Sequence, residues 1–167
     1  VKRQGYTNVF VLEKAAWSET KSGTLKVSPY VGDHKIAVDG VKMDNDLRPG
    51  NENMVNLPVE FSTIDDALAE LGILQLNYLS VTVNGAEHEV LKGAKQTILR
   101  SNNLRVYSKG HAQSANGKPI NIEIKEFLDS IGLNAIITKG EPSSTTDSRW
   151  LWRSGDVYAW KKESETA

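Results

Sequence analysis

The segment YLSVTVNGAEHEVLKGA, residues 78–94, gives the clearest indication of the fold. Its first part, residues 78–83, is rich in aromatic, aliphatic and β-branched residues and predicts a buried strand. Asn84 and Gly85 follow directly and are typical of a tight turn. The apolar residues after this turn recur at helical spacing: Val90, Leu91, Ala94 and Ile98. A strand, a tight turn and a helix in this order open a βαβ unit.

Strand and helix signals continue on both sides of this unit. Upstream, Thr63 and Asp66 are spaced as in a capping box, and they predict a helix that ends at Gly72. Downstream, we expect strands over residues 104–107, 134–138 and 157–161, and a helix that ends at Gly132 with Ile124, Phe127, Leu128 and Ile131 on one face. The alternation of elements indicates a single α/β domain over residues 1–162, with residues 163–167 as a frayed tail.

The N-terminal part has weaker signals. Residues 8–16 and 23–27 are rich in strand-forming residues and flank the polar stretch 18–22, so we expect them to form a hairpin. Residues 33–56 are polar and show no sustained period of either kind, which predicts a long loop. A loop of this length is unusual in a compact domain.

Composition excludes several classes of function. The chain has 167 residues, of which 39% are hydrophobic and 25% charged, and these values are ordinary for a globular domain. It contains no cysteine, which excludes disulfides, thiolate metal sites and thiol nucleophiles. No apolar run approaches the ~18 residues of a membrane span, and no secretory signal is visible at the N-terminus. We therefore expect a cytoplasmic protein that does not bind membranes.

Two motifs resemble a known family. Residues 80–94, SVTVNGAEHEVLKGA, resemble the motif K-I-D-V-E-G-x-E-x-x-V-L-x-G-A of the FkbM family of S-adenosylmethionine-dependent methyltransferases. Residues 62–68, STIDDAL, resemble the T-L-D helix start that lies just upstream in that family. The resemblance implies an α/β fold that is part of a Rossmann-like class I methyltransferase fold. The expected sheet is mixed, has antiparallel C-terminal strands and lacks the first, cofactor-binding strands.

The sequence differs from the family motif at most of the positions where the motif has charged residues. Thr82 takes the place of the aspartate, Asn84 that of the first glutamate and Ser80 that of the lysine, while Glu87 keeps the second glutamate. Among the 13 glycines, no two are closer together than Gly110 and Gly117, so the glycine-rich turn that approaches a nucleotide is missing. We assign no cofactor-binding residue and expect S-adenosylmethionine to bind only if a missing half is supplied.

Polar residues follow two of the predicted parallel strands, and ligands of open α/β sheets bind at such strand ends. The candidate ligand-binding residues at these ends are Thr82, Asn84, Glu87, His88, Lys109 and His111. Two simpler interpretations stay open: Asn84 serves only the turn and the helix cap, and the histidines are solvated. Glu87 and His88 are neighbours on a helix and do not face one direction. We assign no catalytic residue and no metal ligand.

Charge is unevenly distributed although the net charge is only −1. Residues 33–70 carry nine acidic and three basic residues, whereas residues 90–122 carry six basic residues and no acidic one. The two segments are complementary, which indicates electrostatic matching within the chain or between subunits. The basic residues are spread over helix faces without interleaved aromatic residues, so we do not expect a nucleic-acid partner.

A fold that lacks its first, cofactor-binding strands leaves one strand of the sheet without a neighbour. The strand at residues 79–83 would be left with an unpaired edge, and such edges promote association. Either residues 8–16 lie along this edge or two chains pair through it into a homodimer. The favoured function is a methyltransferase-like domain without autonomous methyl transfer that acts as a binding or assembly module. The alternatives are an active methyltransferase completed by a missing part or a partner, and a small-ligand binding protein. The sequence leaves open whether the protein is an enzyme.

Overall fold

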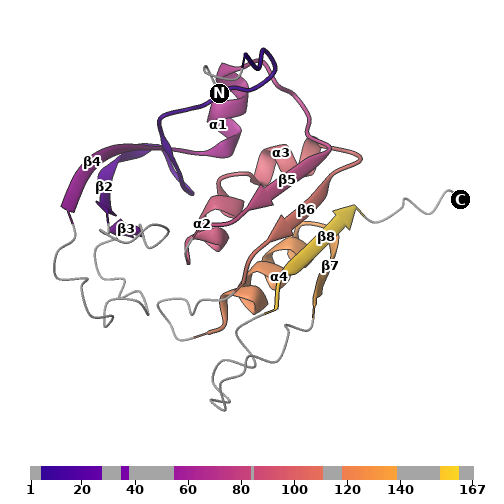
Figure 1. Cartoon of the computed structure of the whole chain (residues 1–167). Coiled ribbons are helices and arrows are strands. Elements are labelled where there is room, and N and C mark those ends of the chain that lie inside the picture. The colour runs from indigo at the N-terminus through magenta and orange to yellow at the C-terminus, as the bar shows by residue number, and fades with distance from the viewer. Residues whose placement is uncertain are drawn as a thin grey trace, which may run out of the picture.

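The computed structural model shows a mixed α/β protein with two four-stranded sheets, both of them mixed (Figure 1). The structure describes residues 5–27, 35–37, 55–83, 85–110, 118–138 and 155–161. Among these residues, none of the helices is both long enough and apolar enough to cross a bilayer.

The first sheet contains the N-terminal strands in the order β1-β4-β2-β3. They are β1 (Ala15–Ala16), β2 (Lys21–Val27), β3 (Lys35–Ala37) and β4 (Val55–Ser62). β4 pairs with β2 in antiparallel fashion and with β1 in parallel fashion, so it lies between them. The predicted hairpin of residues 8–16 and 23–27 is therefore wrong, and only the last two residues of the first segment form a strand.

The strand β4, which was not predicted, takes the place beside β2 that the predicted hairpin gave to residues 8–16. Its residues Val55, Leu57, Val59 and Phe61 alternate with Asn56, Pro58, Glu60 and Ser62, which is a strand pattern. Phe61 is buried and packs against Trp17, with 5.8 Å between the ring centroids. This contact draws β4 in beside β1. The predicted loop over residues 33–56 is wrong for residues 35–37 and 55–56, which are strands, and its other residues lie outside the described part of the chain.

The second sheet has the strand order β5-β6-β8-β7. Its strands are β5 (Tyr78–Val81), β6 (Arg105–Ser108), β7 (Leu133–Ile137) and β8 (Val157–Lys161). β5 and β6 are parallel, and β8 runs antiparallel to both β6 and β7. The expected antiparallel C-terminal strands are thus confirmed. β5 is an outer strand of this sheet, and residues 8–14 form no strand along it.

Three helices cover one face of the second sheet. They are α2 (Glu87–Lys92), α3 (Lys95–Arg100) and α4 (Ile120–Ser130), and in Figure 1 the sheet lies in front of α3 and α4. Their apolar sides form one core with the inward residues of the strands. The predicted core residues Val90, Leu91, Ala94, Ile98, Ile124 and Leu128 are all buried, and Phe127 and Ile131 pack against them. Gly132, with φ +89°, follows α4 at the expected position.

The helix expected after residue 86 is in fact two helices, which are separated at Gly93 and Ala94. Gly93 lies so close to the segment after β1 that a Cβ atom there would be 2.0 Å from the carbonyl oxygen of Trp17. Its own carbonyl accepts a hydrogen bond from the backbone N–H of Asp65 at 2.9 Å. Gly93 is therefore the point where the N-terminal segment, α1 and the helical layer meet.

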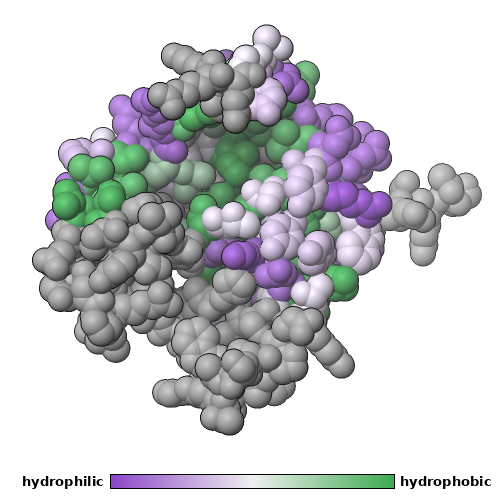
Figure 2. Space-filling model, viewed as in Figure 1, coloured by the Kyte–Doolittle hydropathy of each residue, from purple (hydrophilic) through white to green (hydrophobic). Residues whose placement is uncertain are grey.

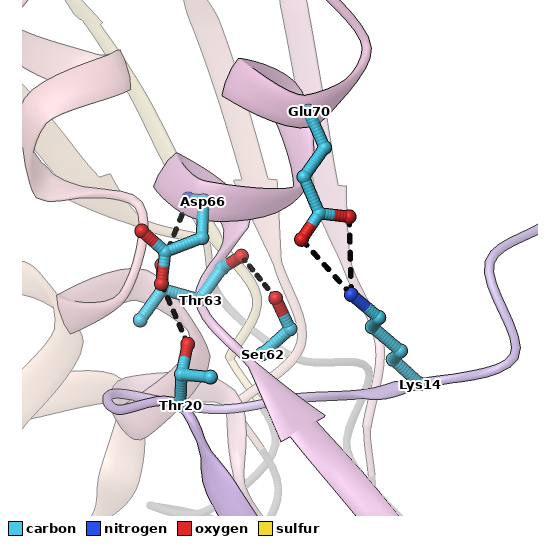
Figure 3. Close-up of polar contacts among 6 residues, drawn as sticks. All are labelled: Lys14, Thr20, Ser62, Thr63, Asp66 and Glu70. Atoms are coloured by element: carbon cyan, nitrogen blue, oxygen red, sulfur yellow. Dashed lines mark hydrogen bonds and ion pairs between the residues drawn. The ribbon is translucent and has the colours of Figure 1, made fainter.

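The helix α1 (Ile64–Glu70) is held by polar contacts with the N-terminal segment (Figure 3). As expected, Thr63 caps it, and its hydroxyl accepts a hydrogen bond from the N–H of Asp66 at 2.9 Å. The carboxylate of Asp66 accepts a hydrogen bond from the Thr20 hydroxyl at 2.6 Å, and Lys14 forms an ion pair with Glu70 at 3.0 Å. The hydrogen bonds from Thr20 and Thr63 lower the pKa of Asp66.

Asp65 joins α1 to α3, which has no capping side chain of its own. Its carboxylate accepts hydrogen bonds from the N–H groups of Gln96, at 2.9 Å, and Thr97, at 2.7 Å. These donors lie in the first turn of α3, where backbone N–H groups have no partner within the helix. A distant carboxylate therefore performs the work of an N-cap.

We expect Asp65→Ala to lower the free energy of unfolding by about 2 kcal/mol, because it leaves two N–H groups of α3 without their acceptor. Urea unfolding followed by circular dichroism measures this loss. Glu70→Ala on the same helix is the matched control, since its exposed ion pair with Lys14 contributes less than about 1 kcal/mol. Equal losses in the two variants would contradict the capping role of Asp65.

The other face of the second sheet carries aromatic side chains and no covering helix among the described residues. Tyr78 is 60% exposed and Tyr158 is 42% exposed. Tyr107 packs against Tyr158, with 5.1 Å between ring centroids, and its hydroxyl donates to Asp156 at 3.0 Å. Figure 2, which has the same view as Figure 1, shows pale and purple residues over this sheet rather than a continuous hydrophobic surface.

Candidate functional site at the carboxyl ends of β5 and β6

The candidate site lies where the two parallel strands end. β5 ends at Val81 and β6 at Ser108, and the N–H of Lys109 donates to the carbonyl of Val81 at 3.1 Å. The chain turns from β5 into α2 at Gly85, whose φ of +89° is a conformation that favours glycine. The predicted turn at this position is thus supported by the backbone of Gly85.

Glu87 is the central residue of this region. It is only 3% exposed, although it carries a carboxyl group. Its two oxygens accept hydrogen bonds from the N–H groups of Val83, at 3.2 Å, and Gly85, at 3.0 Å. Glu87, at the first position of α2, therefore stabilises the turn between β5 and this helix. The N-cap position of α2 is Ala86, which has no side-chain cap, and Asn84, the residue expected to cap this helix, lies outside the described residues.

The surroundings of Glu87 change its acidity. Burial raises its pKa to about 7, while the backbone N–H groups and the positive charge of Lys109 act in the opposite direction. The carboxyl group thus exchanges its proton near neutral pH. Buried carboxyl groups with raised pKa values occur both at active sites and in structural positions. Here the hydrogen bonds to the main chain account for its position.

His88 faces away from Glu87. Its Nδ1 atom lies 3.5 Å from a carboxylate oxygen of Glu123 on α4, and its ring meets the edge of Phe127 at 5.8 Å between centroids. Burial is the largest cause that lowers the pKa of His88, Lys92 lowers it further, and Glu123 opposes the shift. Glu87 and His88 thus make different contacts, as expected for adjacent positions on a helix.

Of the other candidate ligand-binding residues, two lie at the surface and two lie outside the described residues. Thr82 and Lys109 are exposed, and of these two Lys109 acts electrostatically on Glu87. Asn84 and His111 lie outside the described residues. The charge of Lys109 thus acts on Glu87, whereas His88 contacts Glu123 and Phe127 of α4. In the part of the chain that is described, no three His, Asp or Glu side chains come together as a metal site would require.

The sequence interpretation missed a polar junction beside the end of β6. Asn121, at the start of α4, is 2% exposed and donates from Nδ2 to the carbonyl of Gly155 at 3.3 Å. A Cβ atom at Gly110 would lie 2.4 Å from the Cβ of Asn121, so glycine is needed for this approach. The side-chain oxygen of Asn121 is buried without a hydrogen-bond partner. Three separate segments form this junction, and no local pattern relates them.

Two features of the described residues bear on the expectation about S-adenosylmethionine. Thr82 stands where the motif has its aspartate, and the Glu87 carboxylate accepts hydrogen bonds from two main-chain N–H groups. Within the described ranges no strand lies beside β5 on the side away from β6.

One basic residue lies among aromatic residues on the second sheet, contrary to the expectation from the sequence. Basic residues were expected on helix faces without aromatic neighbours, but Arg105 lies on β6 between Tyr78 of β5 and Trp160 of β8 in the strand register. An aromatic and basic row does therefore exist on the sheet. It contains one cation among the described positions of that row, and the protein has a net charge of −1.

No family model matches this sequence, and no curated protein and no solved structure matches it. The fold and the site together define a mixed α/β protein with a buried carboxyl group at the end of a parallel strand pair.

Proposed function

We propose that this chain is a methyltransferase-like domain of the FkbM type that does not transfer methyl groups by itself and acts as a binding or assembly module. The observation that carries the proposal is the sheet order β5-β6-β8-β7, in which a parallel pair is followed by antiparallel strands and β5 is at the edge. This is the arrangement expected for the substrate-side part of a Rossmann-like class I methyltransferase fold without its cofactor-binding strands.

The chemistry of the candidate site supports a role without catalysis. Glu87 is the one motif carboxylate that the sequence retains, and it stabilises the turn after β5 rather than facing solvent. Thr82 in place of the aspartate offers a neutral hydroxyl, which can hydrogen-bond but carries no charge for a cation or a proton transfer. A module that binds or assembles needs neither group to be ionised.

Isothermal titration of this chain with S-adenosylmethionine, and separately with its demethylated product, tests the proposal. We expect no binding at micromolar concentrations, because among the described residues no strand lies beside β5 on the side where the proposed fold would place its cofactor-binding strands. A methyltransferase of known affinity in the same buffer serves as the positive control. Micromolar binding by this chain alone would reject the proposal and favour the alternative of an active methyltransferase.

A further inference from the structure

The outer edge of β5 has no other strand beside it among the described residues. The carbonyls of Asn77 and Val81 accept hydrogen bonds from β6, from the N–H groups of Arg105 at 2.9 Å and Lys109 at 3.1 Å. Because successive residues of a strand direct their backbone groups to opposite sides, the N–H and C=O groups of Tyr78 and Ser80 point away from β6. They have no strand to bond within the described part of the chain.

The sequence around this edge lacks the usual protection against association. From Gly72 to Gly85 there is no charged residue and no proline. Leu74 is 74% exposed and Tyr78 is 60% exposed. Figure 2 shows a hollow with hydrophobic residues beside β5, on the side away from β6. Natural proteins usually place lysine, proline or a covering segment at such an edge.

The opposite edge of the same sheet is protected in a different way. β7 is the outer strand there, and the N–H of Ala135 donates to the side chain of Asp129 on α4 at 3.1 Å. The helix thus occupies a backbone group that would otherwise bond another strand. Among the described residues, α4 thus occupies one backbone N–H group at the β7 edge, whereas no helix side chain is bonded in this way to the outer edge of β5.

We propose that two copies of this chain associate through β5, which pairs with itself in antiparallel orientation about a two-fold axis. Ser80 then faces Ser80 of the second copy, and the two four-stranded sheets become one continuous sheet. A second copy fits this edge because a two-fold axis places β5 of one copy opposite β5 of the other. The strand is uncharged, so no like charges face each other across this contact. This inference rests on the proposed role as an assembly module and names its partner.

Sedimentation equilibrium of the whole chain, from about 5 to 200 µM, tests this pairing. The weight-average mass should rise with concentration toward twice 18.4 kDa. Ser80→Pro removes an outward N–H group, and Tyr78→Lys places on the edge, opposite Thr82 of the second copy, a lysine, which is the residue that natural proteins use to prevent strand pairing. Each variant should raise the dissociation constant at least about tenfold, and circular dichroism establishes which of them fold.

Two matched variants identify the edge. Tyr158→Lys makes the same substitution on β8, which has a strand on both sides, and Ile136→Lys places a charge on β7. Both should dimerise like the unmodified chain. A monomer over the whole concentration range would overturn the proposal, as would a dimer that Tyr78→Lys leaves intact or that Ile136→Lys dissociates. None of these outcomes depends on S-adenosylmethionine, so failure of the dimer and failure of the proposed function are distinguishable.

Discussion

Gly93→Ala should lower the free energy of unfolding by about 3 kcal/mol, the upper part of the usual range for overpacking. The added Cβ atom would lie 2.0 Å from the carbonyl oxygen of Trp17, which is a main-chain atom. A side chain could rotate away, but here a whole segment must move. The backbone of Gly93 is helical, with φ −70°, so alanine itself would gain up to about 1 kcal/mol of helix propensity. The clash exceeds that gain.

Urea unfolding followed by circular dichroism measures the effect of Gly93→Ala. Lys95→Ala is the control, because it lies two residues away, is exposed and belongs to α3. It should change the free energy of unfolding by less than about 0.5 kcal/mol. A Gly93→Ala variant as stable as the control would show that the segment after β1 does not pack tightly against the helical layer.

Glu87→Gln should change how stability depends on pH. The pKa of Glu87 is raised from 4.5 to about 7 in the folded protein, so between these pH values the folded state binds more protons than the unfolded state. The free energy of unfolding therefore falls as the pH rises through this range. The loss attributable to Glu87 is on the order of 3 kcal/mol. Glutamine cannot ionise and should remove this component.

The measurement is a series of urea titrations between about pH 4 and pH 8 on both proteins. His88 contributes a slope of the opposite sign, because its lowered pKa makes the folded state bind fewer protons as the pH approaches its ordinary value of 6.5. His88 is present in both proteins, so the difference between the two profiles isolates Glu87. Parallel profiles would show that Glu87 titrates in the folded protein as it does in the unfolded chain.

Local patterns in the sequence predicted the strands of the second sheet and the helix α4, but they predicted one helix where the structure has α2 and α3. The run at residues 78–83 became β5, and the apolar spacing of Ile124 and Leu128 became the buried side of α4. Thr63 caps α1 as its spacing with Asp66 indicated. Each of these signals is contained within a few residues, since caps, turns and helical periods are set by neighbouring side chains.

The first sheet was predicted poorly because its strands are short and their pairing is not local. β1 has two residues, and it pairs with the end of β4, more than 40 residues further along the chain. Residues 55–62 alternate between apolar and polar residues, but the segment includes Pro58 and follows a long polar stretch, and no strand was predicted there. The contact between the rings of Trp17 and Phe61, and the hydrogen bond from the N–H of Trp17 to the carbonyl of Ser62 at 3.0 Å, join β4 to the segment of β1.

The strands of the second sheet, the apolar sides of the helices and the presence of a carboxyl group at residue 87 could be predicted from the sequence, because period, turn and composition are local properties. The tertiary structure decided what that carboxyl group does: it is buried against Val83 and Gly85, and burial raises its pKa. It also decided how the two sheet edges differ, since Asp129 reaches β7 and no described strand lies beside the outer edge of β5. Desolvation and contacts between distant segments exist only once the chain has folded.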